Sequence, residues 1–162
     1  MPKPDTDSLS TDLYDQPGHL IRRAQQIAVS MFMESAGASA TPIQYAILRT
    51  LQDKPGLDQV SLAQEIGLDN STTAETAARL EAKGLIVREM LPRRQRRLLL
   101  TPAGEQLLVD LVPAVHRMRK AMLSSLEPVE QKEFIRLLRK FVHLNNDQSR
   151  APRGGKVGRQ AA

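Results

Sequence analysis

The sequence predicts a mainly α-helical protein with one small β-hairpin near its centre. Hydrophobic residues make up 41% of the chain and aromatic residues only 3%, which favours helices packed through aliphatic side chains. Residues 58–104 contain, in order, a short amphipathic segment, a turn, a second helical segment and two apolar strands around a basic loop. This order is typical of a winged helix-turn-helix, which lays one helix into a DNA groove. The predicted fold class is mainly α (α+β with a small β-wing), with N- and C-terminal helices forming a dimerisation domain.

Two helices are expected before this central module. In residues 12–35, apolar side chains recur every three or four residues and mark one face of a helix. Pro17-Gly18 should break or restart this helix near its beginning, and Gly37 should end it. The second helix should begin at Thr41-Pro42, because Thr is a good N-cap and Pro suits the first helical position.

The central module itself should contain two helices and a hairpin. Its first helix is predicted at Gln59–Ile66, and the turn Gly67-Leu68-Asp69 separates it from a second helix over residues 70–83. Gly84 should end this second helix, since glycine tolerates the backbone conformation found after a helix. The hairpin then consists of a strand at 85–88, a basic loop at 92–97 and a return strand at 98–100.

Two more helices are expected after the hairpin. Thr101-Pro102 repeats the cap-and-proline start, and a long amphipathic helix follows it. Glu127-Pro128 begins a last helix, whose apolar face includes Phe134 and Phe141. The terminal helices carry more apolar surface than a small module needs. We therefore expect them to pack together and then against a second copy of the chain, as a two-fold homodimer.

The predicted organisation has five parts. They are a flexible N-terminus (1–11), N-terminal helices on the dimerisation and ligand side (12–56), a winged helix-turn-helix DNA-binding domain (57–101), C-terminal dimerisation helices (102–146) and a disordered basic tail (147–162). The formal net charge is +5, but four positive charges lie beyond Ser149, so only +1 remains on the rest of the chain. Such an excess suits a polyanionic partner, and its location is more informative than its sum.

Several classes of function are disfavoured. The chain has no cysteine, which excludes disulfides and thiolate metal sites. No apolar run approaches the roughly 20 residues that span a membrane, and the N-terminus lacks a hydrophobic export segment, so we expect a cytoplasmic protein without a membrane partner. The three histidines lack metal-ligand spacing and no catalytic motif stands out, so neither a cofactor, a metal nor an enzymatic activity is expected.

Two motifs resemble the MarR family of bacterial transcription regulators. They are Leu-Glu-x-x-Gly-Leu-Ile at residues 80–86 and Leu-Thr-Pro-Ala-Gly at residues 100–104. The resemblance covers roughly residues 13–145, and it implies a dimeric, ligand-responsive transcription factor, most often a repressor. The family usually has Asp-Arg-Arg in the wing, whereas this chain has Pro92-Arg93-Arg94. Pro92 cannot accept the hydrogen bond by which that Asp steadies the arginine, so it either stiffens the hairpin or leaves Arg93 to be ordered on DNA.

The second helix of the central module is the expected reader of double-stranded DNA. Small polar side chains at a helix start can cap it, donate to phosphate and reach base edges, and arginine is the commonest reader of guanine. The candidate contacts on this helix are Asn70, Ser71, Thr72, Thr73, Thr76 and Arg79. Asp69 is expected to be the N-cap, and the packing side is expected to hold Ala74, Ala77, Ala78 and Leu80.

The basic loop is the second expected DNA contact. Four arginines, Arg93, Arg94, Arg96 and Arg97, lie within five residues. A run of charges is often only a solvated surface. Here it lies at the tip of a hairpin beside the predicted recognition helix, which favours contact with phosphates or the minor groove. Arg93, which matches the family's wing arginine, is the first candidate, followed by Arg94 and Arg96.

A weaker resemblance suggests the effector. Residues 13–23 are similar to a subgroup linked to aromatic-acid catabolism, whose members respond to hydroxycinnamates, benzoates, nicotinates or their CoA thioesters. This similarity implies a small aromatic effector, either the free acid or its CoA thioester. Family effectors commonly bind between the dimerisation helices and the winged module, so the ligand residues should come from the first two helices.

The candidate ligand residues combine arginines with a tyrosine and a histidine. An arginine can pair with a carboxylate through two hydrogen bonds, and tyrosine offers a flat apolar body with a polar tip. The candidates are His19, Arg22, Arg23, Gln26, Tyr45 and Arg49. The alternative interpretation also stays open, in which the arginines are surface charges or dimer ion pairs and Tyr45 fills the core.

Two other functions stay open at this stage. One is a sequence-independent DNA-binding protein of the nucleoid type, without an effector, which would bind through the charge of its wing and tail. The other is a protein-interaction module that uses the terminal helices. Excess random DNA at physiological salt separates the first from a regulator, because a specific regulator survives this competition. Retained binding after the change of both Thr72 and Arg93 to Ala would favour the second.

Overall fold

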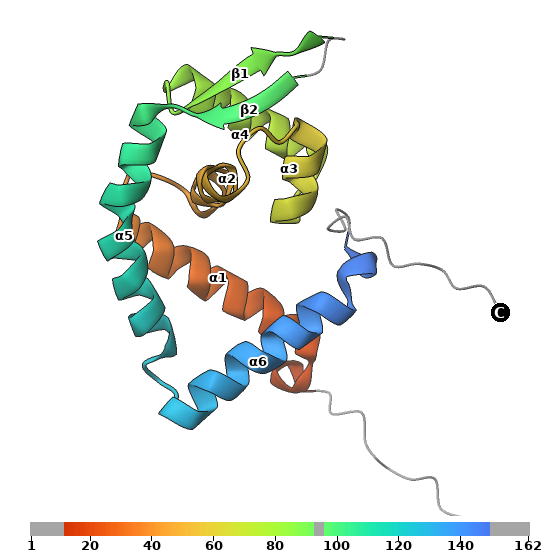
Figure 1. Cartoon of the computed structure of the whole chain (residues 1–162). Helices are drawn as coiled ribbons and strands as arrows, with labels where there is room; N and C mark the ends of the chain where they lie inside the picture. Colours follow the sequence, from red (N-terminus) through yellow and green to blue (C-terminus); the bar gives the residue numbers. More distant parts are fainter. Residues whose placement is uncertain (1–11, 93–95, 150–162) are drawn as a thin grey trace, which may run out of the picture.

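One long helix joins the two parts of the molecule (Figure 1). The computed structural model describes residues 12–92 and 96–149, which form these elements in order: η1 (Leu13–Asp15), α1 (Pro17–Ala36), α2 (Pro42–Asp53), α3 (Gln59–Ile66), α4 (Asn70–Ala82), β1 (Ile86–Met90), β2 (Arg96–Leu100), α5 (Pro102–Leu123), α6 (Pro128–Leu144) and η3 (Asn146–Gln148). The hairpin, α3 and α4 lie at one end of α5, the C-terminal end of α1 packs against its middle, and α6 follows its other end (Figure 1). The mainly α winged helix-turn-helix predicted from the sequence is confirmed.

The first helix starts later than the apolar pattern indicates. Residues 13–15 form a short 3-10 turn, in which the Asp12 side chain accepts a hydrogen bond from the Tyr14 backbone N–H at 2.9 Å. α1 then begins at Pro17, which confirms that Pro17-Gly18 restarts the helix, because proline has no N–H to donate within a helix. Gly37, with φ of 60°, ends it as predicted.

The second helix packs into the winged module. Thr41 and Gln44 form a reciprocal capping box, with hydrogen bonds of 3.1 and 3.2 Å between each side chain and the other residue's backbone N–H. The helix buries Ile47, Leu48 and Leu51 in the cluster that also holds the core residues of α3, α4 and the hairpin. The apolar face of α2 is therefore covered by the winged module, whereas the boundary predicted after residue 56 groups this helix with the N-terminal helices.

A main cluster and a smaller one form the core. The main cluster gathers side chains from α2, α3, α4, both strands and α5, and it includes Leu62, Leu80, Ile86, Leu98 and Leu108. The smaller cluster joins α1 to the middle of α5, and its buried members are Phe32, Ala36, Ala40 and Leu111. Because α5 contributes to both clusters, it connects the winged module to α1 through continuous packing.

The hairpin is joined tightly to the start of α5. β1 and β2 pair antiparallel from Ile86 opposite Leu100 to Met90 opposite Arg96. Thr101 caps α5, and its hydroxyl donates to the Gly84 carbonyl oxygen at 2.6 Å. The backbone of Gly104 passes so close to Leu85 that a side chain would overlap the Leu85 carbonyl oxygen. The resemblance motifs at 80–86 and 100–104 are therefore two sides of one contact.

The last helix has no buried residue. α6 carries an apolar stripe, Phe134, Leu137, Leu138 and Phe141, whose members are between 42% and 49% exposed. In Figure 1, α6 extends from α5 across the open side of the molecule. Helical structure continues into η3, inside the segment 147–162 predicted as a disordered tail, and the rest of that tail and the predicted flexible segment 1–11 lie outside the described residues. Within residues 12–92 and 96–149, no helix is both long and apolar enough to cross a membrane.

Candidate nucleic-acid interface and ligand site

The helix-turn-helix is built by two aspartate caps. Asp58 begins α3, and Asp69 begins α4, where it accepts hydrogen bonds from the Thr72 backbone N–H and the Thr72 hydroxyl, both at 2.8 Å. Gly67 adopts the left-handed conformation between the two helices, with φ of 66°. The expected N-cap role of Asp69 is confirmed. The Thr72 hydroxyl is therefore held at the helix start by this cap.

Two of the predicted DNA contacts on α4 are wrong. Thr73 is fully buried and its hydroxyl donates to the Asp69 carbonyl oxygen at 2.8 Å, while Thr76 is only 8% exposed. Both lie on the face of α4 that packs with Ala77 and Leu80 into the main core. The physical reason is the helical period, because residues three, four and seven positions before a buried Leu80 share its face.

The remaining α4 candidates lie at the surface. Asn70, Ser71 and Arg79 are exposed, and Thr72 is half-buried. Glu75 and Ala78 are exposed as well. Glu75 was not among the candidates predicted from the sequence, and Ala78 was wrongly expected on the packing side. Counting back from the buried Leu80 with the helical period of 3.6 residues places both of these residues on the outer face of α4. The outward face of α4 is therefore centred on Ser71, Glu75, Ala78 and Ala82.

The wing presents one of its arginines beside α4. Arg93 and Arg94 lie outside the described residues. Arg96 lines a hollow of about 280 Å³, which it shares with Glu81, Arg88 and Met90. Arg97 instead pairs with Glu89 on the facing strand, with 2.6 Å between Nη2 and Oε2. Arg96 is thus the described wing arginine that faces the hollow between β-hairpin and α4, whereas Arg97 stabilises the hairpin.

Arg88 links β1 to α4 through two contacts. Its Nη2 donates to the Ala74 carbonyl oxygen of α4 at 3.5 Å. Its Nε lies 3.2 Å from Glu81 Oε2, which is an ion-pair distance outside hydrogen-bond geometry. These contacts bring β1 and the outer side of α4 into one surface, so a polyanion can touch both at once.

The aspartate caps predict a specific sensitivity to acid. The hydrogen bonds from Ser61 lower the pKa of Asp58, and those from Thr72 lower the pKa of Asp69. The stabilisation is complete above the unfolded-state pKa of about 3.9 and is lost as the pH falls through the lower folded-state pKa. We expect the double variant Asp58→Asn/Asp69→Asn, which keeps both caps without a titrating group, to lose less stability than the wild type below about pH 4. Urea unfolding midpoints at about pH 6 and pH 3 measure this difference, and equal losses would contradict it.

The α1 ligand candidates lie on the part of that helix remote from α2 (Figure 1). Arg22 Nη2 lies 3.4 Å from His19 Nδ1, and Arg23 Nη1 donates to Gln26 Oε1 at 3.3 Å. A guanidinium can only donate, so His19 Nδ1 accepts and the ring proton lies on Nε2. This Nε2 is buried and has no hydrogen-bond partner among residues 12–92 and 96–149, while the ring edge contacts Tyr14.

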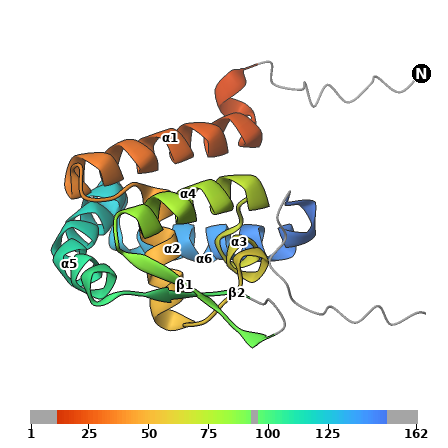
Figure 2. The ribbon, with the colours of Figure 1, turned by 90° about the horizontal axis from the view of Figure 1, so that it is seen from above.

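The two α2 candidates have structural neighbours. Tyr45 is half-buried, touches both core clusters and lies 5.6 Å from Phe32 between ring centroids. Arg49 pairs with Asp53 at 3.1 Å and also contacts Gln52. The structure brings His19 and Arg22 together and also Arg23 and Gln26, but the α2 pair occupies a different part of the molecule (Figures 1 and 2). Whether an effector uses either group stays a prediction.

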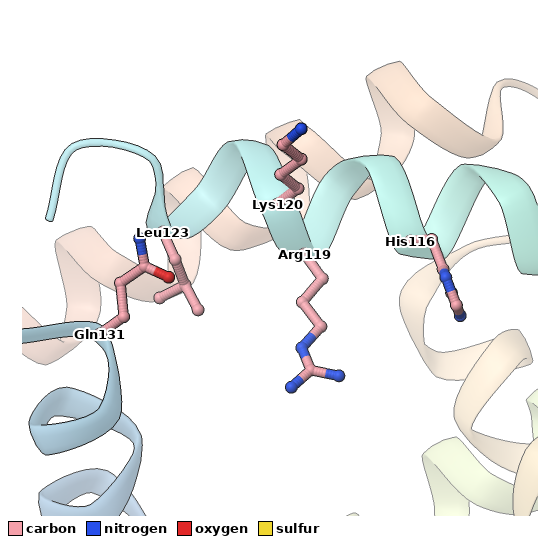
Figure 3. A pocket seen from close by; sticks show the side chains of 5 residues that line it. All are labelled: His116, Arg119, Lys120, Leu123 and Gln131. Atoms are coloured by element: carbon pink, nitrogen blue, oxygen red, sulfur yellow. The ribbon is translucent and has the colours of Figure 1, made fainter. Parts of the chain in front are cut away.

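A basic hollow that the sequence pattern did not reveal lies between α5 and α6. It has a volume of about 220 Å³ and is lined by His116, Arg119, Lys120, Leu123 and Gln131 (Figure 3). Arg119 extends into the open space between the two helices in Figure 3. The sequence does contain three basic residues within one and a half turns of an amphipathic helix, which is a signal for a basic surface. The position of α6 beside them depends on the tertiary fold and cannot be read from this pattern. In the part of the chain that the structure describes, no cluster of three or more His, Asp or Glu is placed to hold a metal.

The sequence matches known regulators. The MarR family model matches residues 40–98. Transcriptional regulator HosA of Escherichia coli O111:H- is 37% identical over 105 residues, which are 64% of this chain and 78% of HosA. The HTH-type transcriptional repressor NicR of Pseudomonas putida is 29% identical over 139 residues, which are 84% of this chain and 88% of NicR.

Solved structures agree with the sequence matches. The PcaV regulator of Streptomyces coelicolor in complex with its natural ligand has a TM-score of 0.77 and 35% identity, covering 83% of this chain and 96% of PcaV. Bordetella bronchiseptica BpsR, whose DNA binding is regulated by 6-hydroxynicotinic acid, has a TM-score of 0.76 and 29% identity, covering 80% of this chain and 96% of BpsR. The repressor CouR bound to a 23-mer DNA duplex has a TM-score of 0.76 and 25% identity, covering 82% and 96%. The chain therefore belongs to the MarR family of transcriptional regulators.

Proposed function

We propose that this chain acts in the cytoplasm as a homodimeric, ligand-responsive repressor. It binds a pseudo-palindromic operator in double-stranded DNA and is released by a small aromatic acid or its CoA thioester. The observation that carries the proposal is the exposed face of α4, which lies beside a hollow lined by Arg88 and Arg96. An outward helix beside cationic side chains can enter a major groove while the wing neutralises phosphates. The proposed contacts are Asn70, Ser71, Thr72, Arg79 and Arg96, together with Arg93 and Arg94.

The dimer part of the proposal rests on exposed apolar surface. Besides the stripe of α6, Leu20, Ile21 and Ile27 of α1 are between 44% and 52% exposed. Monomeric proteins rarely leave a large apolar patch in water, and a second copy of the chain would bury these side chains. A two-fold dimer then presents two α4 helices to half-sites about one helical turn apart, roughly 10 base pairs centre to centre.

The effector part rests on polar groups in the N-terminal half of α1 and in the hollow between α5 and α6. His19 Nε2–H has no hydrogen-bond partner among residues 12–92 and 96–149, and Arg22 and Arg23 are exposed cations near it that can pair with a carboxylate. The basic hollow between α5 and α6 is open and suits the phosphates of a CoA thioester. The structure of PcaV with its natural ligand supports a ligand-responsive regulator, and the regulation of BpsR by 6-hydroxynicotinic acid supports an aromatic acid. Effector and operator should weaken each other's binding by the same factor, a coupling of about 1–3 kcal/mol.

A DNA titration tests the proposed function. The purified protein is titrated onto DNA from immediately upstream of its own gene, with excess random DNA and a panel of aromatic acids and their CoA thioesters. We expect tight binding that survives the competitor and is released by one compound. Binding abolished by the competitor would instead favour a sequence-independent DNA-binding protein. Specific binding that no compound releases would contradict the aromatic effector and leave the operator-binding role.

The salt dependence of binding measures the contribution of Arg96. Each phosphate contact adds close to one unit to the slope of log affinity against log salt concentration. We therefore expect Arg96→Ala to reduce this slope by about one unit per protomer on any duplex. Arg117→Ala, which removes an exposed arginine of α5 outside the proposed interface, is the control and should leave the slope unchanged. An unchanged slope for Arg96→Ala would remove this residue from the interface.

A further inference from the structure

We propose that Glu75 and Arg79 of α4 act together as the base-reading pair of this protein, and that they select G·C base pairs in each half-site. The inference rests on the proposed operator binding and adds to it the specificity-determining residues and the bases that they recognise. Glu75 was not among the sequence candidates, and it occupies the centre of the outward face of α4.

The two side chains are joined and both face solvent. Arg79 Nη2 lies 2.6 Å from Glu75 Oε1, and the side chains are 64% and 65% exposed. They are four residues apart, so they lie on one side of the helix one turn from each other. The contact uses one guanidinium nitrogen and one carboxylate oxygen, which leaves donors on Arg79 and an acceptor on Glu75 for a ligand.

The neighbours of this pair are short. Ser71, Ala74, Ala78 and Ala82 occupy the other exposed or half-exposed positions along the same face. Their side chains allow the α4 backbone to come close to the floor of a groove, where Glu75 and Arg79 are the longest groups. The pair is therefore positioned to reach base edges when α4 lies in the major groove.

The carboxylate is the informative member of the pair. A negative charge in the middle of a DNA-facing surface is repelled by phosphates, so it weakens sequence-independent binding. Two nearby carboxylates have partners in the fold, since Asp69 caps α4 and Glu81 pairs with Arg88. Glu75 contacts only Arg79 among the partners observed for it in the described chain. An acidic group here suits one feature of DNA, the amino donor of cytosine.

The chemistry of the two groups defines the bases. Arginine donates two hydrogen bonds to O6 and N7 of guanine, and glutamate accepts from N4 of cytosine. The Glu75 contact also restrains the guanidinium, so that less side-chain freedom is lost when Arg79 binds a base. An exposed i, i+4 ion pair that only supports the helix would leave base preference untouched. Base preference therefore distinguishes a reading role from a structural one.

The test is selection of bound sequences from a randomised duplex pool with four forms of the full chain. They are the wild type, Glu75→Gln, Arg79→Ala and the control Glu133→Gln, which breaks an exposed Glu–Arg pair on the polar side of α6. We expect Glu75→Gln to replace a cytosine preference by adenine at one position per half-site, because glutamine pairs with adenine. Arg79→Ala should lower discrimination for guanine about 10-fold at one position. Glu75→Gln should also bind random DNA more tightly, and the control should match the wild type.

The outcomes separate this inference from the proposed function. If the wild type enriches no sequence, operator binding itself fails and the inference fails with it. If the wild type enriches an operator and both α4 variants enrich the same bases, the proposed function stands and the reading role is overturned. Circular dichroism verifies that each variant keeps the helical content of the wild type, so a changed preference reports on recognition and not on folding.

Discussion

The variant Gly104→Ala is expected to lose about 3 kcal/mol or more of the free energy of unfolding. Gly104 lies in the first turn of α5, directly against the end of the helix-turn-helix. A Cβ built on it would overlap the Leu85 carbonyl oxygen and lie 3.1 Å from the Leu85 carbonyl carbon and 3.3 Å from Leu100 Cδ2. The first two atoms are backbone, so they can move only if the hairpin and α5 separate. The midpoint of urea unfolding measures the loss.

Gly18→Ala is the matched control for this prediction. Gly18 lies in the first turn of α1, and a Cβ there has no heavy atom within 4 Å. Alanine is the better helix former, so this variant should be as stable as the wild type or slightly more stable. If Gly104→Ala were equally stable, the close approach of α5 to Leu85 would not exist in solution. A loss in Gly104→Ala alone ties the Leu-Thr-Pro-Ala-Gly motif to packing between the wing and α5.

Local signals predicted the elements well because each has a local physical cause. Thr41 and Thr101 cap their helices through their own side chains, and the prolines that follow occupy the first helical position. Asp69 caps α4 in the same way, and Gly37 and Gly67 adopt the positive φ that ends a helix. These features depend on a few consecutive residues, so they can be read without knowledge of the partner elements.

The errors arose where a residue's role depends on what covers it. Small polar residues follow one another at the start of α4, and composition alone does not tell which of them face the core. The buried Leu80 fixes the inner face, and it places Thr73 and Thr76 inside and Glu75 outside. The packing of α2 is another property that local signals leave open, because its apolar face could pack against either part of the molecule. The hollow between α5 and α6 likewise depends on a helix that lies far along the chain.

The double variant Leu138→Glu/Phe141→Glu is expected to convert the protein to a monomer and to lower operator affinity about 100-fold or more. Both side chains belong to the apolar stripe of α6, and they are 43% and 49% exposed within one chain. Burying two carboxylates in a dimer interface is unfavourable without partners, so the two copies should separate. A monomer holds one half-site only, and the gain from holding two α4 helices at a fixed spacing is lost.

The control variant changes the net charge by the same amount, but at a position outside the apolar stripe of α6. Arg139→Glu alters the net charge by two, as the double variant does, but it lies on the polar side of α6. Light scattering gives the mass of each variant, and a titration with operator DNA gives its affinity. Since α6 has no buried residue within its own chain, the double variant should retain the helical content and unfolding cooperativity of the winged module. A dimer that survives both glutamates would place the interface elsewhere, whereas a monomer that binds the operator as tightly as the wild type would remove the need for two recognition helices. The expected combination, a folded monomer with weak operator binding, would show that α6 holds together the two copies that present the α4 helices.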